Sequence, residues 1–211
     1  MTLGPLPGIP AGAYRVCMDE ILAMPSGPLA DAALSLAQRT ENTPVADHSI
    51  RSFFFARLLA NQDGSAGDAA YDENLLFAAC IMHDLGLGTS AHGKERLEVE
   101  SADLAAGLLR QHGVAAADVG RVWEAIALHS SIGIAGRRGL LTCLTHKGVF
   151  TDAGQLTDLE EGLRQQVFAA YPRPAGDTYI RDAIVAHAKR SPAAAPPYSI
   201  AAELLRQERT R

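Results

Sequence analysis

Hydrophobic positions recur along most of the chain at helical spacing, and no segment shows the strict alternation that is typical of a strand. We expect helices over residues 13–23, 29–39, 44–61, 74–82, 94–111, 115–130, 136–152, 157–170, 177–190 and 198–207. Thr43 is the expected N-cap of the third of these helices, with Pro44 in its first position. Residues 157–160, TDLE, have the form of a capping box. The pattern predicts an all-α protein, a single-domain helical bundle.

Proline-rich composition divides the end of the chain from the rest. We predict one helical domain over residues 1–190, with the chemically informative motifs at about 44–154. The segment SPAAAPP then forms a stiff linker, so residues 191–211 are predicted to be this linker and a short C-terminal helix.

Composition excludes several classes of partner. Of the 211 residues, 47% are hydrophobic and 20% charged, and the net charge of −5 comes without a basic tract, which argues against binding to nucleic acid. No apolar run is long enough to span a membrane, and the N-terminus lacks the features of a secretory signal. Three widely spaced cysteines, Cys17, Cys80 and Cys143, indicate free thiols in a reducing compartment. We therefore expect a cytoplasmic protein that binds a small molecule, with terminal segments that could pack in a homo-oligomer.

The pair His83-Asp84 ends the apolar run NLLFAACIM and carries the strongest chemical signal. Gly86 is expected to stop this helix in the left-handed conformation. A helix C-terminus carries about half a negative charge, so an aspartate there is repelled unless a cation offsets it. The placement predicts a bound divalent metal ion.

Other ionisable side chains are also directed toward the predicted core. His48 and His129 each lie on an apolar helical stripe, and Asp152 shares a face with small and apolar residues. An unpaired buried charge is costly, so these groups need partners. Two imidazoles, His48 and His83, and two carboxylates, Asp84 and Asp152, would be neutral in sum around a divalent ion.

The order of these residues resembles the HD-domain superfamily of metal-dependent hydrolases. The segments HSIRSFFFARLLA, AACIMHDLGLG, RLEVESADLAAGLL, AIALHSSIGIA and GVFTDAG resemble the cyanamide hydratase-like branch of that superfamily. The resemblance covers roughly residues 44–154 and implies that His48, His83, Asp84 and Asp152 are the metal ligands. Zinc is the preferred ion, with iron or manganese as alternatives.

The resemblance also implies a reaction. A metal-activated water would add to a small nitrile such as cyanamide and give urea. Asp84 or His129 would transfer the proton, and Arg51 and His129 would contact the substrate. The chain departs from the branch at THKGVFTDAG, because His146 and Lys147 precede the final aspartate where the branch usually has no such pair.

Three alternatives remain open. An HD-type phosphohydrolase would keep the same ligands and hold the phosphate of a nucleotide or small ester with Arg51, Lys94 or Lys147. A dinuclear iron oxygenase would need further ligands, for which His112 and His129 are the candidates. A non-catalytic domain could keep the scaffold for ligand sensing or assembly.

Overall fold

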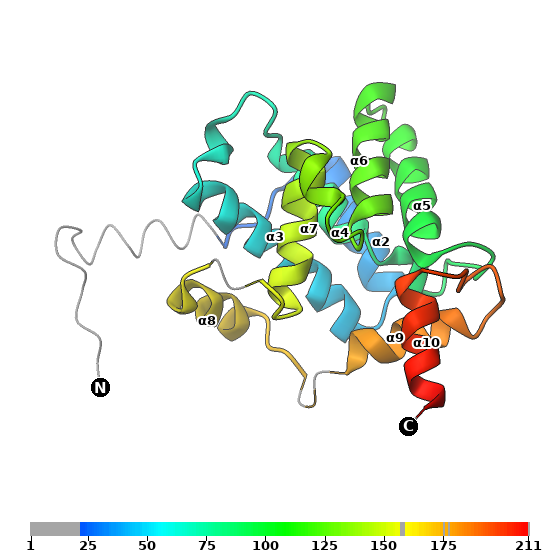
Figure 1. Ribbon diagram of the computed structural model, residues 1–211. Coiled ribbons are helices and arrows are strands. Elements are labelled where there is room, and N and C mark those ends of the chain that lie inside the picture. The colour runs from blue at the N-terminus through cyan, green and yellow to red at the C-terminus, as the bar shows by residue number, and fades with distance from the viewer. Residues whose placement is uncertain (1–21, 157–158, 175, 177, 211) are drawn as a thin grey trace, which may run out of the picture.

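The computed structural model describes residues 22–156, 159–174, 176 and 178–210, and in these ranges all regular structure is helical (Figure 1). The α-helices are α2 (Pro28–Thr40), α3 (Thr43–Gln62), α4 (Glu73–Met82), α5 (Leu97–Gln111), α6 (Ala116–Leu128), α7 (Leu140–Asp152), α8 (Glu161–Ala170), α9 (Tyr179–Ala188) and α10 (Ile200–Arg209). Three 3-10 turns, η1 (Ser65–Gly67), η2 (Leu85–Leu87) and η3 (Ala135–Arg137), lie between them. The predicted all-α bundle is confirmed.

The long helix α3 lies at the centre of the bundle. Its side chains from Val45 to Ala60 are almost all buried, including the aromatic run Phe53–Phe55. It packs most extensively on α7, and Gly148 of α7 permits the close approach. A Cβ at Gly148 would stand 2.2 Å from the backbone oxygen of Ser52, so only glycine fits between these helices.

Helix α4 is the second buried element and ends at the chemically important pair. All its residues from Leu75 to Met82 are buried, which explains why its sequence is apolar on every side. Asp72 caps its N-terminus by accepting hydrogen bonds from the backbone N–H groups of Asn74 and Leu75. Helices α2, α3, α6 and α7 surround it.

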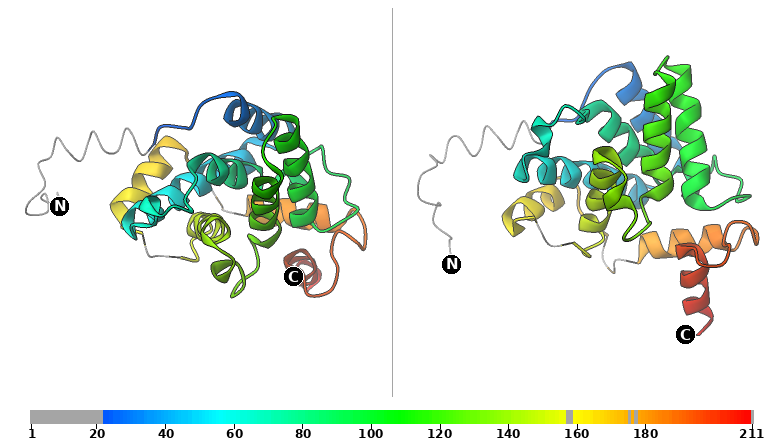
Figure 2. Two further views of the ribbon diagram at one scale, coloured as in Figure 1. Left: turned by 90° about the horizontal axis from the view of Figure 1, so that it is seen from above. Right: turned by 45° about the horizontal axis from the view of Figure 1, so that its top comes forward.

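Four of the remaining helices form two pairs, and α8 packs on α3. Figure 1 shows α5 and α6 side by side, and Figure 2 shows α9 and α10 at the periphery of the bundle. The α9–α10 pair has a small apolar cluster of its own, in which Ile184, Ala188 and Ala201 pack on Leu97 at the start of α5. Through this cluster the C-terminal helices pack on the start of α5. The 3-10 turn η2, which directly follows His83-Asp84, also packs on α5, so the C-terminal helices lie near that pair.

Two of the predictions about local structure, those for Thr43 and Gly86, were wrong. The N-cap of α3 is Asn42 and not Thr43, because the Asn42 side chain accepts a hydrogen bond from the backbone N–H of Val45. Gly86 does not adopt a left-handed conformation and lies instead in η2. Glycine is required at position 86 because a larger residue does not fit: a Cβ there would stand 2.3 Å from the backbone oxygen of Leu97.

Some predictions fall beyond the described residues. The helix expected over 13–23 lies almost wholly outside them, as does Cys17, and so do Thr157 and Asp158 of the expected capping box. Within the described ranges, no helix combines the length and the apolar content that crossing a bilayer requires.

Candidate metal centre and cavity

Three buried side chains, one from α3 and two from the end of α4, meet inside the bundle. His48 lies in the second turn of α3, and His83 and Asp84 directly follow the last residue of α4. All three are at most 3% exposed. Asp84 lies in the bridge between α4 and η2, outside regular helix, where its carboxylate can turn back toward the two imidazoles.

Hydrogen bonds fix the orientation of both rings. His83 donates from Nδ1 to the backbone oxygen of Cys80 at 2.7 Å. His48 donates from Nδ1 to Oδ2 of Asp152 at 2.5 Å. A neutral imidazole with its proton on Nδ1 has a lone pair on Nε2, which is the state that binds metals. Both Nε2 atoms are therefore available as ligands.

The geometry of the three donor atoms fits a single cation. His48 Nε2 lies 3.3 Å from His83 Nε2 and 3.7 Å from Asp84 Oδ2, and His83 Nε2 lies 3.2 Å from the same oxygen. Ligands about 2.1 Å from one tetrahedral zinc ion stand about 3.4 Å apart. Two lone pairs and a carboxylate that face one another repel unless a positive charge lies between them. The His48, His83 and Asp84 cluster is therefore compatible with a divalent metal ion.

Asp152, the fourth predicted ligand, is not part of this cluster. Besides the bond to His48, its carboxylate accepts hydrogen bonds from Nε of Arg51 at 2.7 Å and from Nη2 at 3.1 Å. Arg51 in turn donates from Nη2 to the hydroxyl of Tyr179 at 2.6 Å. This network connects α9 through α3 and α7 to His48. A direct bond from Asp152 to a metal stays a prediction.

The electrostatics of the site follow from these contacts. Burial raises the pKa of Asp84, but in the metal-free protein the charge of a protonated His83, and the hydrogen bond that its Nε2–H then donates, outweigh burial and hold that pKa well below the usual range. Burial likewise raises the pKa of Asp152, yet the bonds from His48 and Arg51 lower it to about 2. Burial and the neighbouring His83 lower the pKa of His129 to about 4. At neutral pH both carboxylates are charged and His129 is neutral.

His129 lies beside the cluster without joining it. Its ring centroid is 4.8 Å from that of His83, and its Nδ1 donates to the backbone oxygen of Ile126 at 2.7 Å. The proton on Nδ1 leaves Nε2 with a lone pair. His129 can therefore accept a proton or a hydrogen bond from a molecule next to the cluster.

A cavity of about 260 Å³ gives access to these groups. The predicted residues His48, His83, Asp84, His129 and Asp152 line it, whereas Arg51 does not. The described lining also includes residues from the last third of the chain: Arg173, Tyr179, Ile180, Arg181, Ile184, Ile200 and Leu204. No local sequence signal marked these positions, because they reach the cavity only when α9 and α10 fold back.

One further group near the cavity was missed. Glu98 of α5 is fully buried, and its Oε1 accepts hydrogen bonds from Ser130 Oγ at 2.5 Å and from Arg96 Nη2 at 2.9 Å. Ser130 follows His129 and lines the cavity. The sequence signal that could have identified Glu98 is its position as a charged residue within the apolar face of α5. A charged group is buried only when it has partners, so this position predicts a buried, hydrogen-bonded carboxylate.

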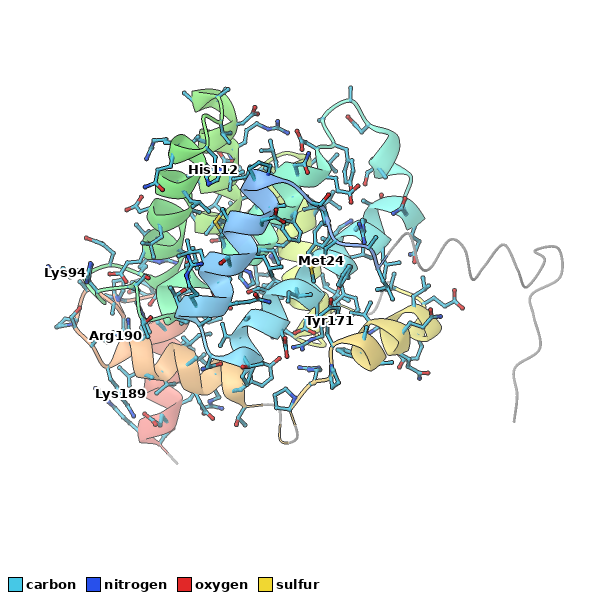
Figure 3. The ribbon with its side chains drawn as sticks, turned by 180° about the vertical axis from the view of Figure 1, so that it is seen from behind. Met24, Lys94, His112, Tyr171, Lys189 and Arg190 are labelled. Atoms are coloured by element: carbon cyan, nitrogen blue, oxygen red, sulfur yellow. The ribbon has the colours of Figure 1, made fainter. Side chains whose placement is uncertain are left out.

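The other candidate residues lie away from the cavity. Lys147 pairs with Asp63 at 3.5 Å, and Lys94 is exposed in the loop before α5. His146 donates from Nδ1 to the backbone oxygen of His129 at 2.7 Å, so it helps to hold the backbone of that residue in place. His112 is exposed at the end of α5 that lies farthest from Lys94, as Figure 3 shows, and it cannot complete a dinuclear site.

Comparison with known families agrees with this arrangement. The model of the HD domain family matches residues 45–207, most of the chain, and the protein belongs to that family. HD domains bind divalent metals and are typically metal-dependent hydrolases. A comparison with curated proteins finds no match.

Proposed function

We propose that the protein is a metal-dependent hydratase that adds water to the carbon of a small nitrile, as in the cyanamide hydratase-like branch. The observation that carries the proposal is the convergence of His48 Nε2, His83 Nε2 and Asp84 Oδ2 at 3.2–3.7 Å beside a small cavity. A divalent ion held by His48, His83 and Asp84 would lower the pKa of a bound water from 15.7 to about 7 and so would supply hydroxide at neutral pH. Zinc suits the mixed nitrogen and oxygen donors.

The residues of the chain would divide the remaining tasks. Addition of water forms a carbon–oxygen bond and places both hydrogens of the water on the nitrile nitrogen, which gives an amide, or urea from cyanamide. His129 is the better proton carrier because its lowered pKa leaves Nε2 unprotonated at neutral pH. Asp84, the other predicted carrier, is a weak base because its pKa lies below the usual range.

Arg51 and Asp152 would act on the cluster through His48. A carboxylate that accepts the Nδ1–H of a metal-binding histidine fixes the ring and makes it a better ligand. Arg51 holds Asp152 with two hydrogen bonds and is itself fully buried. This supports a positioning role for Arg51 in place of the substrate contact predicted from the sequence.

A phosphohydrolase is the second candidate, and one observation favours it. Two guanidinium groups, Arg173 and Arg181, line the cavity and would attract a phosphate group. The three phosphate-binding residues suggested by the sequence, Arg51, Lys94 and Lys147, do not line it. The two candidates share the metal cluster and differ in substrate.

Metal analysis combined with a substrate panel tests the proposal. The purified chain should retain or bind one equivalent of zinc, and the His83→Ala variant should not, whereas His112→Ala at an exposed position should bind normally. Cyanamide and short nitriles should be hydrated in a zinc-dependent reaction. Failure to bind metal would refute the metal mechanism, and zinc-dependent release of phosphate without nitrile hydration would favour the phosphohydrolase.

A further inference from the structure

The cavity has a second chemical feature besides the metal-binding cluster. Arg181, on the first turn of α9, lines the cavity and is only partly exposed. Its Nη2 atom is buried and has no hydrogen-bond partner. A guanidinium N–H that is withdrawn from water without an acceptor is unfavourable, so this atom is free to bind an acceptor from the cavity.

The neighbouring groups do not satisfy Arg181. Asp182, the next residue on α9, accepts a hydrogen bond from the hydroxyl of Thr178 at 2.9 Å. The hydroxyl of Tyr179 accepts from Arg51. The nearest polar atoms on the same turn of α9 therefore have other partners.

The charges around the cavity favour an anion at this position. The carboxylates in the described lining are Asp84 and Asp152, and Arg51 already balances Asp152 with two hydrogen bonds. Asp84 faces the metal-binding histidines. Arg173 and Arg181 add two positive charges to the same walls, so the cavity is positive overall once a divalent ion is bound.

Much of the remaining wall is apolar, although Ser130, Gln155 and Tyr179 also line it. Ile180 and Ile184 of α9, Ile200 and Leu204 of α10, and Val149 of α7 contribute aliphatic side chains. A volume of about 260 Å³ exceeds what a molecule with three non-hydrogen atoms, such as cyanamide, fills. Ligand-binding cavities in proteins, typically about 300–1,000 Å³ and so somewhat larger than this one, recognise an apolar body through a few polar groups.

We infer that Arg181 binds an anionic oxygen group, a carboxylate or a phosphate, on a substrate whose short aliphatic part lies against the isoleucines of α9. The inference rests on the proposed function, because the reacting carbon of the same molecule would lie at the His48, His83 and Asp84 cluster. The preferred substrate is then a small acid with two functional ends, and cyanamide, which has no anionic group, would be bound more weakly.

Calorimetric binding to the zinc-loaded full chain tests the inference with matched probes. The probes are 3-cyanopropanoate, its neutral analogue 3-cyanopropanamide, and propyl phosphate. Hydrogen bonds between charged groups change affinity by about ten- to a hundredfold. We expect 3-cyanopropanoate to bind at least tenfold more tightly than the amide, and Arg181→Gln to remove that difference while zinc affinity stays the same.

Two variants control for the fold and for general charge. Arg181→Lys keeps the charge but not the fork of donors, so it should retain part of the preference for the acid. Arg121→Gln removes an exposed arginine that pairs with Asp118 on α6, away from the cavity, and should leave all probe affinities unchanged.

The outcomes separate this inference from the proposed function. Equal binding of the acid and the amide by the wild-type chain overturns the inference if propyl phosphate also binds without dependence on Arg181, and an unchanged preference in Arg181→Gln overturns it outright. Arg181-dependent binding of propyl phosphate alone supports the anion site but contradicts nitrile hydration. Arg181-dependent binding of 3-cyanopropanoate without its hydration supports the anion site and refutes the proposed reaction.

Discussion

Replacing Gly148 by alanine tests the contact that holds the two sides of the candidate metal centre together. A Cβ on Gly148 would stand 2.2 Å from the backbone oxygen of Ser52 and 2.9 Å from the Cβ of Ala56. These atoms belong to the backbone of α3 and to its shortest side chain, so they cannot rotate away. His48 lies one turn before Ser52, and Asp152 lies one turn after Gly148.

The expected cost follows from that overlap. Ordinary van der Waals contact requires α3 and α7 to separate by roughly 1 Å. Overpacking of this kind costs about 1–3 kcal/mol, and the backbone overlap places Gly148→Ala at the upper end. Alanine inside a helix recovers about 1 kcal/mol relative to glycine. We expect the free energy of unfolding to fall by about 2 kcal/mol.

Urea denaturation of the metal-free chain, followed by circular dichroism, measures this change. Gly120→Ala is the matched control because Gly120 lies within α6 and nothing stands within 4 Å of its Cβ position. That control should gain up to about 1 kcal/mol. Zinc affinity gives a second readout: separating the helices lengthens the 2.5 Å contact from His48 to Asp152, so affinity should fall about 10–100-fold. A Gly148→Ala chain as stable as the wild type, with unchanged zinc affinity, would refute the reasoning.

Three further predictions concern single side chains. Tyr179→Phe removes the acceptor 2.6 Å from Arg51 Nη2 and should lower the free energy of unfolding by about 1.5 kcal/mol, measured in urea; an unchanged midpoint contradicts it. Burial, with a smaller effect from Asp84, raises the pKa of Glu41 well above 4.5, so its stabilising contribution is lost as pH rises through the folded-state pKa. Glu41→Gln should therefore be more stable than the wild type at neutral pH, and melts across pH should show a flatter profile. Zinc at a hundredfold excess over its Kd should stabilise the wild type by about 2.7 kcal/mol and His83→Ala not at all, with reversal by a chelator.

The periodicity of apolar residues was sufficient to predict the helices because most of them bury one face. Their ends were harder to predict, as the start of α5 shows. The pattern placed it at Lys94, but the helix begins at Leu97. The carboxylate of Glu100 accepts hydrogen bonds from the backbone N–H groups of Gly93, Lys94 and Glu95 and keeps them in the preceding loop. The start of α5 is therefore set by hydrogen bonds to the side chain of Glu100, and the spacing of hydrophobic residues does not reveal them.

The candidate site was also predictable only in part from the sequence. His48, His83 and Asp84 could be singled out from the sequence because ionisable residues lie within or directly after buried helices there, and because their order resembles the HD-domain motif. The contact of Arg51 with Asp152 joins residues 101 positions apart, and that of Arg51 with Tyr179 joins residues 128 apart. No local pattern records such pairings. The sequence therefore predicts the cluster that could hold a metal but not what surrounds it.

The predicted division at residue 190 follows composition, but the cavity extends across it. Ile200 and Leu204 lie on α10, beyond the proline-rich segment, and they line the same space as His48. An ion pair of 2.8 Å between Lys189 and Glu208, together with the burial of Ala201, holds α10 on α9. Removing residues 191–211 would open one wall of the cavity to water and expose the apolar face of α9. Because a charge is worth more in a water-excluded site, the terminal helix contributes to how strongly the remaining groups act on a bound molecule.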